Sequence, residues 1–146
     1  MSLVRKIVIE NLQHKVPVSE KRIRNIVSDA LNFLKAAKPA QFNIYFVNDR
    51  KITRLNRRYL KEDRPTDVIS FDISAGKKEM LADIFISADT AFSNARKFNT
   101  TPDYELCLYA VHGVLHLLGF NDTTARQSAA MHRKEKQILD QFFLRK

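Results

Sequence analysis

Two histidines four residues apart form the most informative chemical pattern in the sequence. His112 and His116 lie in the run HGVLHLLGFND, which ends at Asp122. Four helical residues turn about 400°, so the two imidazoles leave one face of a helix one turn apart. Gly119 allows a tight chain reversal, which can return Asp122 as a third ligand. The spacing therefore predicts a metal site formed by His112, His116 and Asp122.

A site with three protein ligands suits catalysis. It leaves one coordination position open, where a bound water loses a proton near neutral pH. We therefore expect the same three side chains to be catalytic. The alternative is a pair of core histidines satisfied by hydrogen bonds. The glycine at position 113 also requires an explanation, because a glycine inside a helix lowers stability by about 1 kcal/mol relative to alanine. Close approach of another chain segment or of a substrate would supply one.

The same spacing also resembles the zinc-protease signature. That signature requires a glutamate directly after the first histidine, as the general base. Gly113 occupies this position here, so the proteolytic mechanism would lack its proton acceptor. A peptidase is therefore a weaker interpretation than a nuclease.

The histidines need a domain that positions them. The segment from Thr101 to Gly119 is apolar on nearly all sides and opens with a threonine cap and a proline, which predicts a central buried helix. Thr124 and Gln127 form a capping box for a last helix to about residue 143. Other helices are expected over 19–36, 48–64 and 87–98, and strands over 7–9, 42–46, 68–73 and 81–86. This irregular alternation predicts a single α+β domain over residues 1–146, with a small mixed sheet packed against helices.

The composition is that of a basic globular domain. The chain has 146 residues, with 25 Lys and Arg against 16 Asp and Glu, and a formal charge of +9. A net positive charge of this size attracts RNA, DNA or an acidic membrane. The alternative is that the charge only keeps the chain in solution. The single cysteine excludes an intramolecular disulfide and fits a reducing compartment. The first six residues do not resemble a signal peptide, and the longest apolar run is too short to cross a bilayer. We therefore expect a cytoplasmic protein.

Basic side chains gather between residues 50 and 64. A solvated helix face is the usual meaning of such a run. Contact with an RNA backbone is the functional alternative. The arginines that we expect to make this contact are Arg54, Arg57, Arg58 and Arg64.

Glu135 lies on the apolar face of the last predicted helix. An unpaired carboxylate is costly in such surroundings. It therefore either pairs with an arginine or lysine, or orients a metal-ligating histidine from behind. The sequence leaves both interpretations open.

Three motifs follow one another along the chain. Residues 112–122 match H-G-x-L-H-L-x-G-[YF]-D-H up to the phenylalanine, residues 55–71 match most of L-N-x-x-Y-R-x-x-D-x-P-T-D-V-L-S-F, and residues 81–87 match most of L-G-D-I-x-I-S. These are the motifs of the YbeY family of bacterial metal-dependent endoribonucleases, which the chain resembles over roughly residues 42–142.

The resemblance implies both an activity and a cellular role. It implies an α+β fold, zinc bound by the first motif and hydrolysis of single-stranded RNA. It further implies maturation of the 3′ end of 16S ribosomal RNA and ribosome quality control, with the small ribosomal subunit as partner and neither membrane nor DNA as a target. The alternative is a ribosome-associated RNA-binding factor with a structural metal. Structural zinc normally has four ligands, which argues mildly against it.

The chain departs from the family pattern at three positions. Asp122 stands where the family usually has a third histidine, and its charge should make the bound water less acidic and harder metals such as Mn²⁺ more competitive with Zn²⁺. Leu60 replaces an arginine, whose phosphate-binding role cannot be carried over, although Arg57, Arg58 or Arg64 could substitute. Ala82 replaces a glycine.

Overall fold

The computed structural model describes residues 5–76 and 78–144. Residues 1–4, part of the segment for which no signal peptide was expected, lie outside the described residues. The elements in chain order are β1 (Arg5–Asn11), α1 (Glu20–Phe33), β2 (Ala40–Val47), α2 (Asp49–Leu55), β3 (Val68–Asp72), β4 (Met80–Ser87), α3 (Ala88–Lys97), α4 (Pro102–Leu117) and α5 (Ala125–Leu144).

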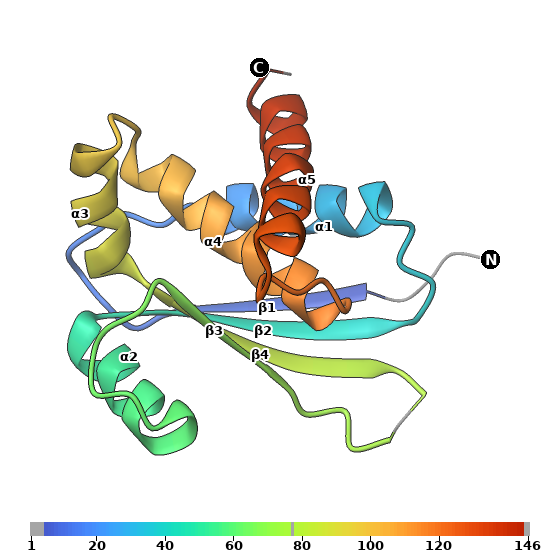
Figure 1. The fold of residues 1–146 in the computed structure, drawn as a ribbon, viewed down its shortest axis with the longest axis horizontal. Coiled ribbons are helices and arrows are strands. Elements are labelled where there is room, and N and C mark those ends of the chain that lie inside the picture. The colour runs from blue at the N-terminus through green and yellow to red at the C-terminus, as the bar shows by residue number, and fades with distance from the viewer. Residues whose placement is uncertain (1–4, 77, 145–146) are drawn as a thin grey trace.

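The four strands form one mixed sheet in the order β1-β2-β4-β3. β2 pairs in parallel with β1 and β4, and β3 runs antiparallel to β4 at the edge. Figure 1 shows α1, α4 and α5 on one side of the sheet and α2 on the other. The predicted α+β fold with a small mixed sheet is confirmed. None of the described helices is both long and apolar enough to span a membrane.

α4 is the buried helix that the apolar segment predicted. Thr101 caps it by accepting a hydrogen bond from the Tyr104 backbone N–H at 3.1 Å, and a proline opens its first turn. Nine of its residues are buried. α4 packs against β3, β4, α1, α3 and α5. It therefore lies at the centre of the domain.

Gly113 allows α4 to lie unusually close to the sheet. A Cβ atom at this position would lie 2.9 Å from Ser70 Oγ and 3.0 Å from Ile84 Cγ2. Real Cβ contacts are essentially never this short, so a larger residue would force Ser70, Ile84 or the helix itself to shift. The close approach of another chain segment is therefore the reason for a glycine here.

The helix predicted over 48–64 is correct only in its first half. Asn48 caps α2 as expected, accepting a hydrogen bond from the Lys51 backbone at 2.9 Å. After Leu55 the chain widens into a π-helical turn over Asn56–Leu60, which ends at Lys61 with φ +58°, four residues before Pro65. The buried Asn56 amide donates to the Arg64 carbonyl at 2.9 Å and folds the chain back early.

The remaining boundaries agree with the local signals. Thr124 and Gln127 make both hydrogen bonds of the predicted capping box, at 3.1 and 3.2 Å. The strand predicted over 7–9 is longer, because β1 pairs with β2 along its whole length, from Arg5 opposite Ala40 to Asn11 opposite Phe46.

Candidate metal centre

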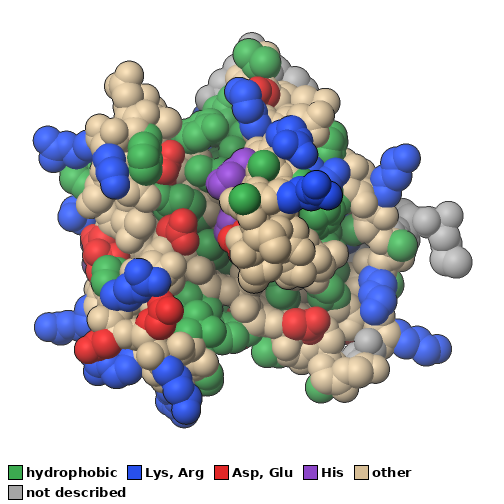
Figure 2. Space-filling view, in the orientation of Figure 1, with side chains coloured by type: hydrophobic (Ala, Val, Ile, Leu, Met, Phe, Trp, Pro, Cys, Tyr) green, Lys and Arg blue, Asp and Glu red, His purple; other side chains and the backbone are tan. Residues whose placement is uncertain are grey.

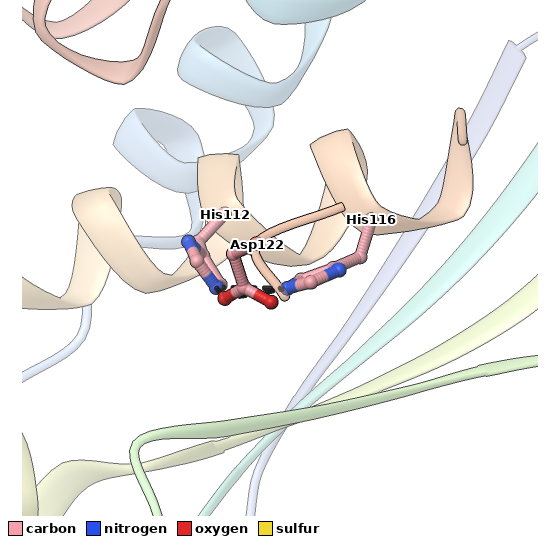
Figure 3. A group of neighbouring side chains, drawn as sticks. All are labelled: His112, His116 and Asp122. Atoms are coloured by element: carbon pink, nitrogen blue, oxygen red, sulfur yellow. Dashed lines mark hydrogen bonds and ion pairs between the residues drawn. The ribbon is translucent and has the colours of Figure 1, made fainter. Parts of the chain in front are cut away.

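α4 and the loop after it bring three predicted ligands together. His112 and His116 project from one face of α4, and Asp122 returns between them (Figure 3). The two Nε2 atoms are 3.0 Å apart. Asp122 Oδ2 lies 3.7 Å from His112 Nε2 and 3.5 Å from His116 Nε2. All three ligand atoms thus face one point.

These distances suit a tetrahedral metal ion. Zinc bonds of about 2.0–2.1 Å place two tetrahedral ligands about 3.3 Å apart. The observed separations of 3.0, 3.5 and 3.7 Å bracket that value. Two imidazole nitrogens and one carboxylate oxygen are donors that Zn²⁺ and neighbouring divalent ions accept. The group could therefore hold a metal ion.

A glycine-based reversal returns Asp122 to the histidines. Gly119 has φ +99°, a conformation that favours glycine. The Phe120 N–H donates to the Leu115 carbonyl at 3.0 Å, and the Gly119 N–H donates to the His116 carbonyl at 3.1 Å. This is the hydrogen-bond pattern of a Schellman cap. The cap ends α4 at Leu117, one residue after the second histidine, so the chain doubles back over the site.

Glu135 contacts His112 at Nδ1, the ring nitrogen that does not face the other predicted ligands. Its side chain is 3% exposed, and its Oε2 contacts His112 Nδ1 while its Oε1 lies 3.0 Å from His132 Nδ1. The partners found for this carboxylate among the described residues are therefore histidines rather than an arginine or lysine. A carboxylate that accepts the Nδ1 proton of a neutral imidazole leaves Nε2 unprotonated and able to bind a metal.

The acidic surroundings also favour a proton on His112. Burial by itself lowers the pKa of His112, but the hydrogen bond to Glu135 and the negative charges of Glu135, Asp67 and Asp122 outweigh burial. The net result is a pKa above the ordinary 6.5. A cluster that holds a proton on a histidine in this way also attracts a metal cation to the same place.

One of the three predicted ligands, His112, borders a surface cavity. A cavity of about 300 Å³ beside His112 lies between α4 and α5, with Asp67, Tyr109, His132 and Lys136 in its lining. Figure 2 shows histidine side chains in a hollow of this face of the molecule, with lysine and arginine side chains nearby. Asp122 is the most exposed of the three predicted ligands. One side of the group is therefore accessible to a substrate.

The four predicted RNA-binding arginines lie elsewhere. Arg54 and Arg57 line a groove of about 450 Å³ beside α2, and Arg58 lies over the Tyr59 ring at 5.4 Å. Arg57 pairs with Asp63 and Arg64 pairs with Glu62. None of their described contacts reaches the histidines. Their position therefore allows contact with a long ligand, and it does not make them part of the metal centre.

Two further residues near the centre were not among the predicted ligands. Asp67 adds negative charge close to His112 from the start of β3. Its place in the second motif was the available signal. His132 is 68% exposed, yet it contacts Glu135. The three-residue spacing on one helix could have indicated this pair.

The fold and these side chains define a small α+β protein with candidate metal ligands at the surface of its central helix. The family model described as Endoribonuclease YbeY matches residues 8–143. The chain therefore belongs to the YbeY family of endoribonucleases, which are hydrolases that act on RNA. The resemblance seen in the motifs is confirmed.

Individual relatives cover nearly the whole chain. A protein of Syntrophus aciditrophicus named Endoribonuclease YbeY is 36% identical over 145 residues, which are 94% of this chain and 88% of the relative. One of Geobacter metallireducens with the same name is 34% identical, with coverages of 91% and 93%. The solution structure of TM1509 from Thermotoga maritima matches with a TM-score of 0.61 and 26% identity, over 94% of this chain and 89% of the other.

Proposed function

We propose that the chain is a metal-dependent, single-strand-specific endoribonuclease, with residues 1–146 as one catalytic domain. His112, His116 and Asp122 hold the metal. The observation that carries the proposal is the triangle of donor atoms, 3.0–3.7 Å on a side, on the central helix of an endoribonuclease family member. Zn²⁺ is the expected ion, and Asp122 makes Mn²⁺ or a similar ion more competitive than three histidines would.

Each part of the site has a separate task. A divalent ion held there supplies Lewis-acid polarisation of a phosphoryl oxygen and lowers the pKa of a coordinated water. Glu135 holds the His112 ring with Nε2 toward Asp122. The exposed side of Asp122 leaves room for an RNA phosphate. The RNA backbone on either side is neutralised by four arginines at a distance, namely Arg54, Arg57, Arg58 and Arg64.

The cellular role follows from family membership. We propose that the substrate is ribosomal RNA, that cleavage matures the 3′ end of 16S RNA and serves ribosome quality control, and that the small ribosomal subunit is the partner in the cytoplasm. The charge of +9 supports an RNA target, because a positive field attracts polyanions.

Two other functions fit less well. A purely structural metal would normally have four protein ligands, whereas the described residues of this group supply three. A peptidase would need a glutamate in place of Gly113. Even a Cβ there would lie 2.9 Å from Ser70 Oγ. The position that would carry a protease's base thus faces the sheet instead of a substrate.

Substitution of one ligand tests the proposal. We expect His116→Ala to keep its fold and its RNA affinity, and to lose cleavage of single-stranded RNA by roughly a hundredfold or more. Bound metal, measured in the same samples, should fall in parallel. The exposed His14, away from α4, supplies the control His14→Ala, which should cleave normally. Undiminished cleavage by His116→Ala would remove the metal centre from the reaction.

A further inference from the structure

A row of aromatic rings crosses the face of the sheet that α2 only partly covers. Tyr45 on β2 stacks on Phe85 of β4, with ring centroids 4.7 Å apart and planes at 16°. Phe85 meets Phe71 of β3 edge-on at 6.1 Å. Phe71 meets Tyr59 of the π-helical turn edge-on at 5.1 Å. Four rings from three strands and one turn thus form a continuous surface.

A cavity of about 430 Å³ opens at the end of this row. Tyr59, Phe71 and Phe85 line one part of it, and Asp72 and Asp83 line another. Tyr59 is 53% exposed. A contiguous apolar surface of this kind beside a cavity is a mark of a ligand-binding groove.

The charges around the cavity are arranged by sign. Asp83 accepts a hydrogen bond from the Asn43 amide at 3.0 Å, and hydrogen bonds from Ser74 hold the pKa of Asp72 below its usual value. Both carboxylates therefore keep phosphate out of the cavity. Positive charge lies outside, where the Arg58 guanidinium stands 5.4 Å from the Tyr59 ring centroid. This pattern fits a nucleotide whose base enters while its phosphate stays at the rim.

β3 connects the cavity to the candidate metal centre. Ser70 lines the cavity, and its hydroxyl donates to the Gly113 carbonyl on α4 at 3.4 Å. Gly113 directly follows His112. One edge strand therefore separates the aromatic cavity from the metal ligands, so a single RNA strand crossing β3 could occupy both.

We propose that this aromatic cavity is a subsite that stacks one unpaired base of the RNA substrate against Tyr59 and Phe71. The inference rests on the proposed function for the identity of the ligand as RNA. An aromatic face stacks on any base without reading its sequence, which suits a nuclease for single strands. A base held in a duplex cannot enter, so the subsite would also select against paired RNA.

Binding measurements with substituted protein and RNA test the subsite. The probe is a fluorescein-labelled single-stranded RNA dodecamer, compared with the same RNA carrying abasic nucleotides at its centre. Affinities are measured by anisotropy in the His116→Ala background, so that the RNA stays intact, and cleavage is measured separately without that substitution. The variants are Tyr59→Ala, Tyr59→Phe and Leu60→Ala. Leu60 is the matched control, because it lies in the same turn and is 54% exposed.

We expect Tyr59→Ala to weaken binding of the intact RNA by about tenfold, with Tyr59→Phe and Leu60→Ala within about twofold of the parent. The abasic RNA should bind the parent about tenfold more weakly and should not distinguish it from Tyr59→Ala, because the lost partner is the same. Equal weakening of both RNAs by Tyr59→Ala would show a backbone contact and overturn the base subsite.

The outcomes separate this inference from the proposed function. Unchanged RNA binding by Tyr59→Ala would overturn the subsite, and a cavity that takes a protein side chain would give that result. Cleavage that still depends on His116 would then leave the proposed function standing. Conversely, cleavage that survives His116→Ala would overturn the proposed function. The anisotropy comparison, repeated with nuclease-resistant 2′-O-methyl RNA of the same sequence, would still decide whether a base binds beside Tyr59.

Discussion

α4 and the segment formed by α2 and its π-helical turn lie on opposite sides of the sheet (Figure 1). α4 is a regular helix of 16 residues, capped at both ends and in contact with the sheet through Gly113. The other segment has seven α-helical residues followed by five in a wider turn, and it leaves Tyr59 and Leu60 about half exposed. α4 is packed on nearly all sides, whereas α2 and its π-helical turn are packed mainly on the side that faces the sheet.

The difference matches the demands of the two proposed tasks. A metal needs donor atoms placed to within a few tenths of an ångström, which only a packed helix with supporting contacts such as Glu135–His112 can provide. RNA backbone contact needs only charges near a flexible chain. A short, exposed segment suffices for that. The comparison predicts that substitutions on α4 act on the site's geometry, whereas those on α2 act on binding.

The largest effect is expected where α4 meets the sheet. Gly113→Val should lower the free energy of unfolding by about 3 kcal/mol, because its side chain collides with Ser70 and Ile84. Gly113→Ala should cost less, since alanine's helix propensity returns about 1 kcal/mol. Urea unfolding measures both. Adding Ser70→Ala should recover part of the loss in Gly113→Ala. A Gly113→Val protein as stable as the parent would show that α4 is not held by this contact.

The next effect concerns the support behind His112. Glu135→Ala should weaken metal affinity and cleavage by roughly 10–100-fold, because the imidazole loses the acceptor for its Nδ1 proton. The metal affinity and cleavage rate of Glu135→Gln should lie between those of the parent and of Glu135→Ala, since an amide oxygen can still accept a hydrogen bond from Nδ1. Competition titration with a chelator gives the affinity. Affinity equal to the parent in both variants would mean that α4 alone orients the ring.

Proton competition should make metal binding depend on pH. A metal must displace the proton on His112, whose raised pKa keeps it protonated above pH 6.5. Affinity should therefore fall by up to about tenfold per pH unit below that pKa. In the metal-free protein, the raised pKa of His112 contributes to the free energy of unfolding. This contribution is complete below pH 6.5 and is lost as the pH rises through the pKa of His112 in the folded protein. The gain in melting temperature on adding Zn²⁺ should thus increase as the pH rises through the pKa of His112. A constant gain would contradict proton competition at this histidine.

The smallest effect per residue is expected on α2 and its π-helical turn. Replacing Arg54, Arg57 and Arg58 together by glutamine should weaken RNA binding. It should also reduce the slope of log affinity against log salt concentration by about 2, because each lost phosphate contact contributes roughly 0.7. The unfolding free energy should change little, because these side chains are exposed. An unchanged slope would remove this segment from the RNA-binding surface. Loss of metal affinity would break the proposed division between the two helices.

Much of the fold could be predicted because its signals are local. The α4 cap at Thr101, the capping box at Thr124 and the glycine stop at Gly119 all act within one helical turn. The pairing of His112 with His116 depends on the same short-range geometry. Asp122 follows through a cap whose hydrogen bonds span five residues. No knowledge of the sheet was needed for any of these.

The errors arose where distant parts of the chain compete with local preference. The α-helix predicted over 48–64 ends at Leu55 and continues only as a π-helical turn to Leu60, since the buried Asn56 bonds to Arg64 and turns the chain early. The partner of Glu135 could not be chosen from sequence, because His112 is 23 residues away on another helix. The aromatic row was invisible for the same reason, as its rings meet only through the strand order β2-β4-β3.

By itself, the amino-acid sequence determined the helices, the central position of α4 and the three side chains offered to a metal, because helix periodicity and capping depend on neighbours within a few residues. Only the tertiary structure decided what supports and surrounds them. The 3.0–3.7 Å triangle, the carboxylate behind His112 and the rings beside β3 all require backbones from separate elements to pack at one place. Local pattern does not encode that packing, since it results from burial summed over the whole domain.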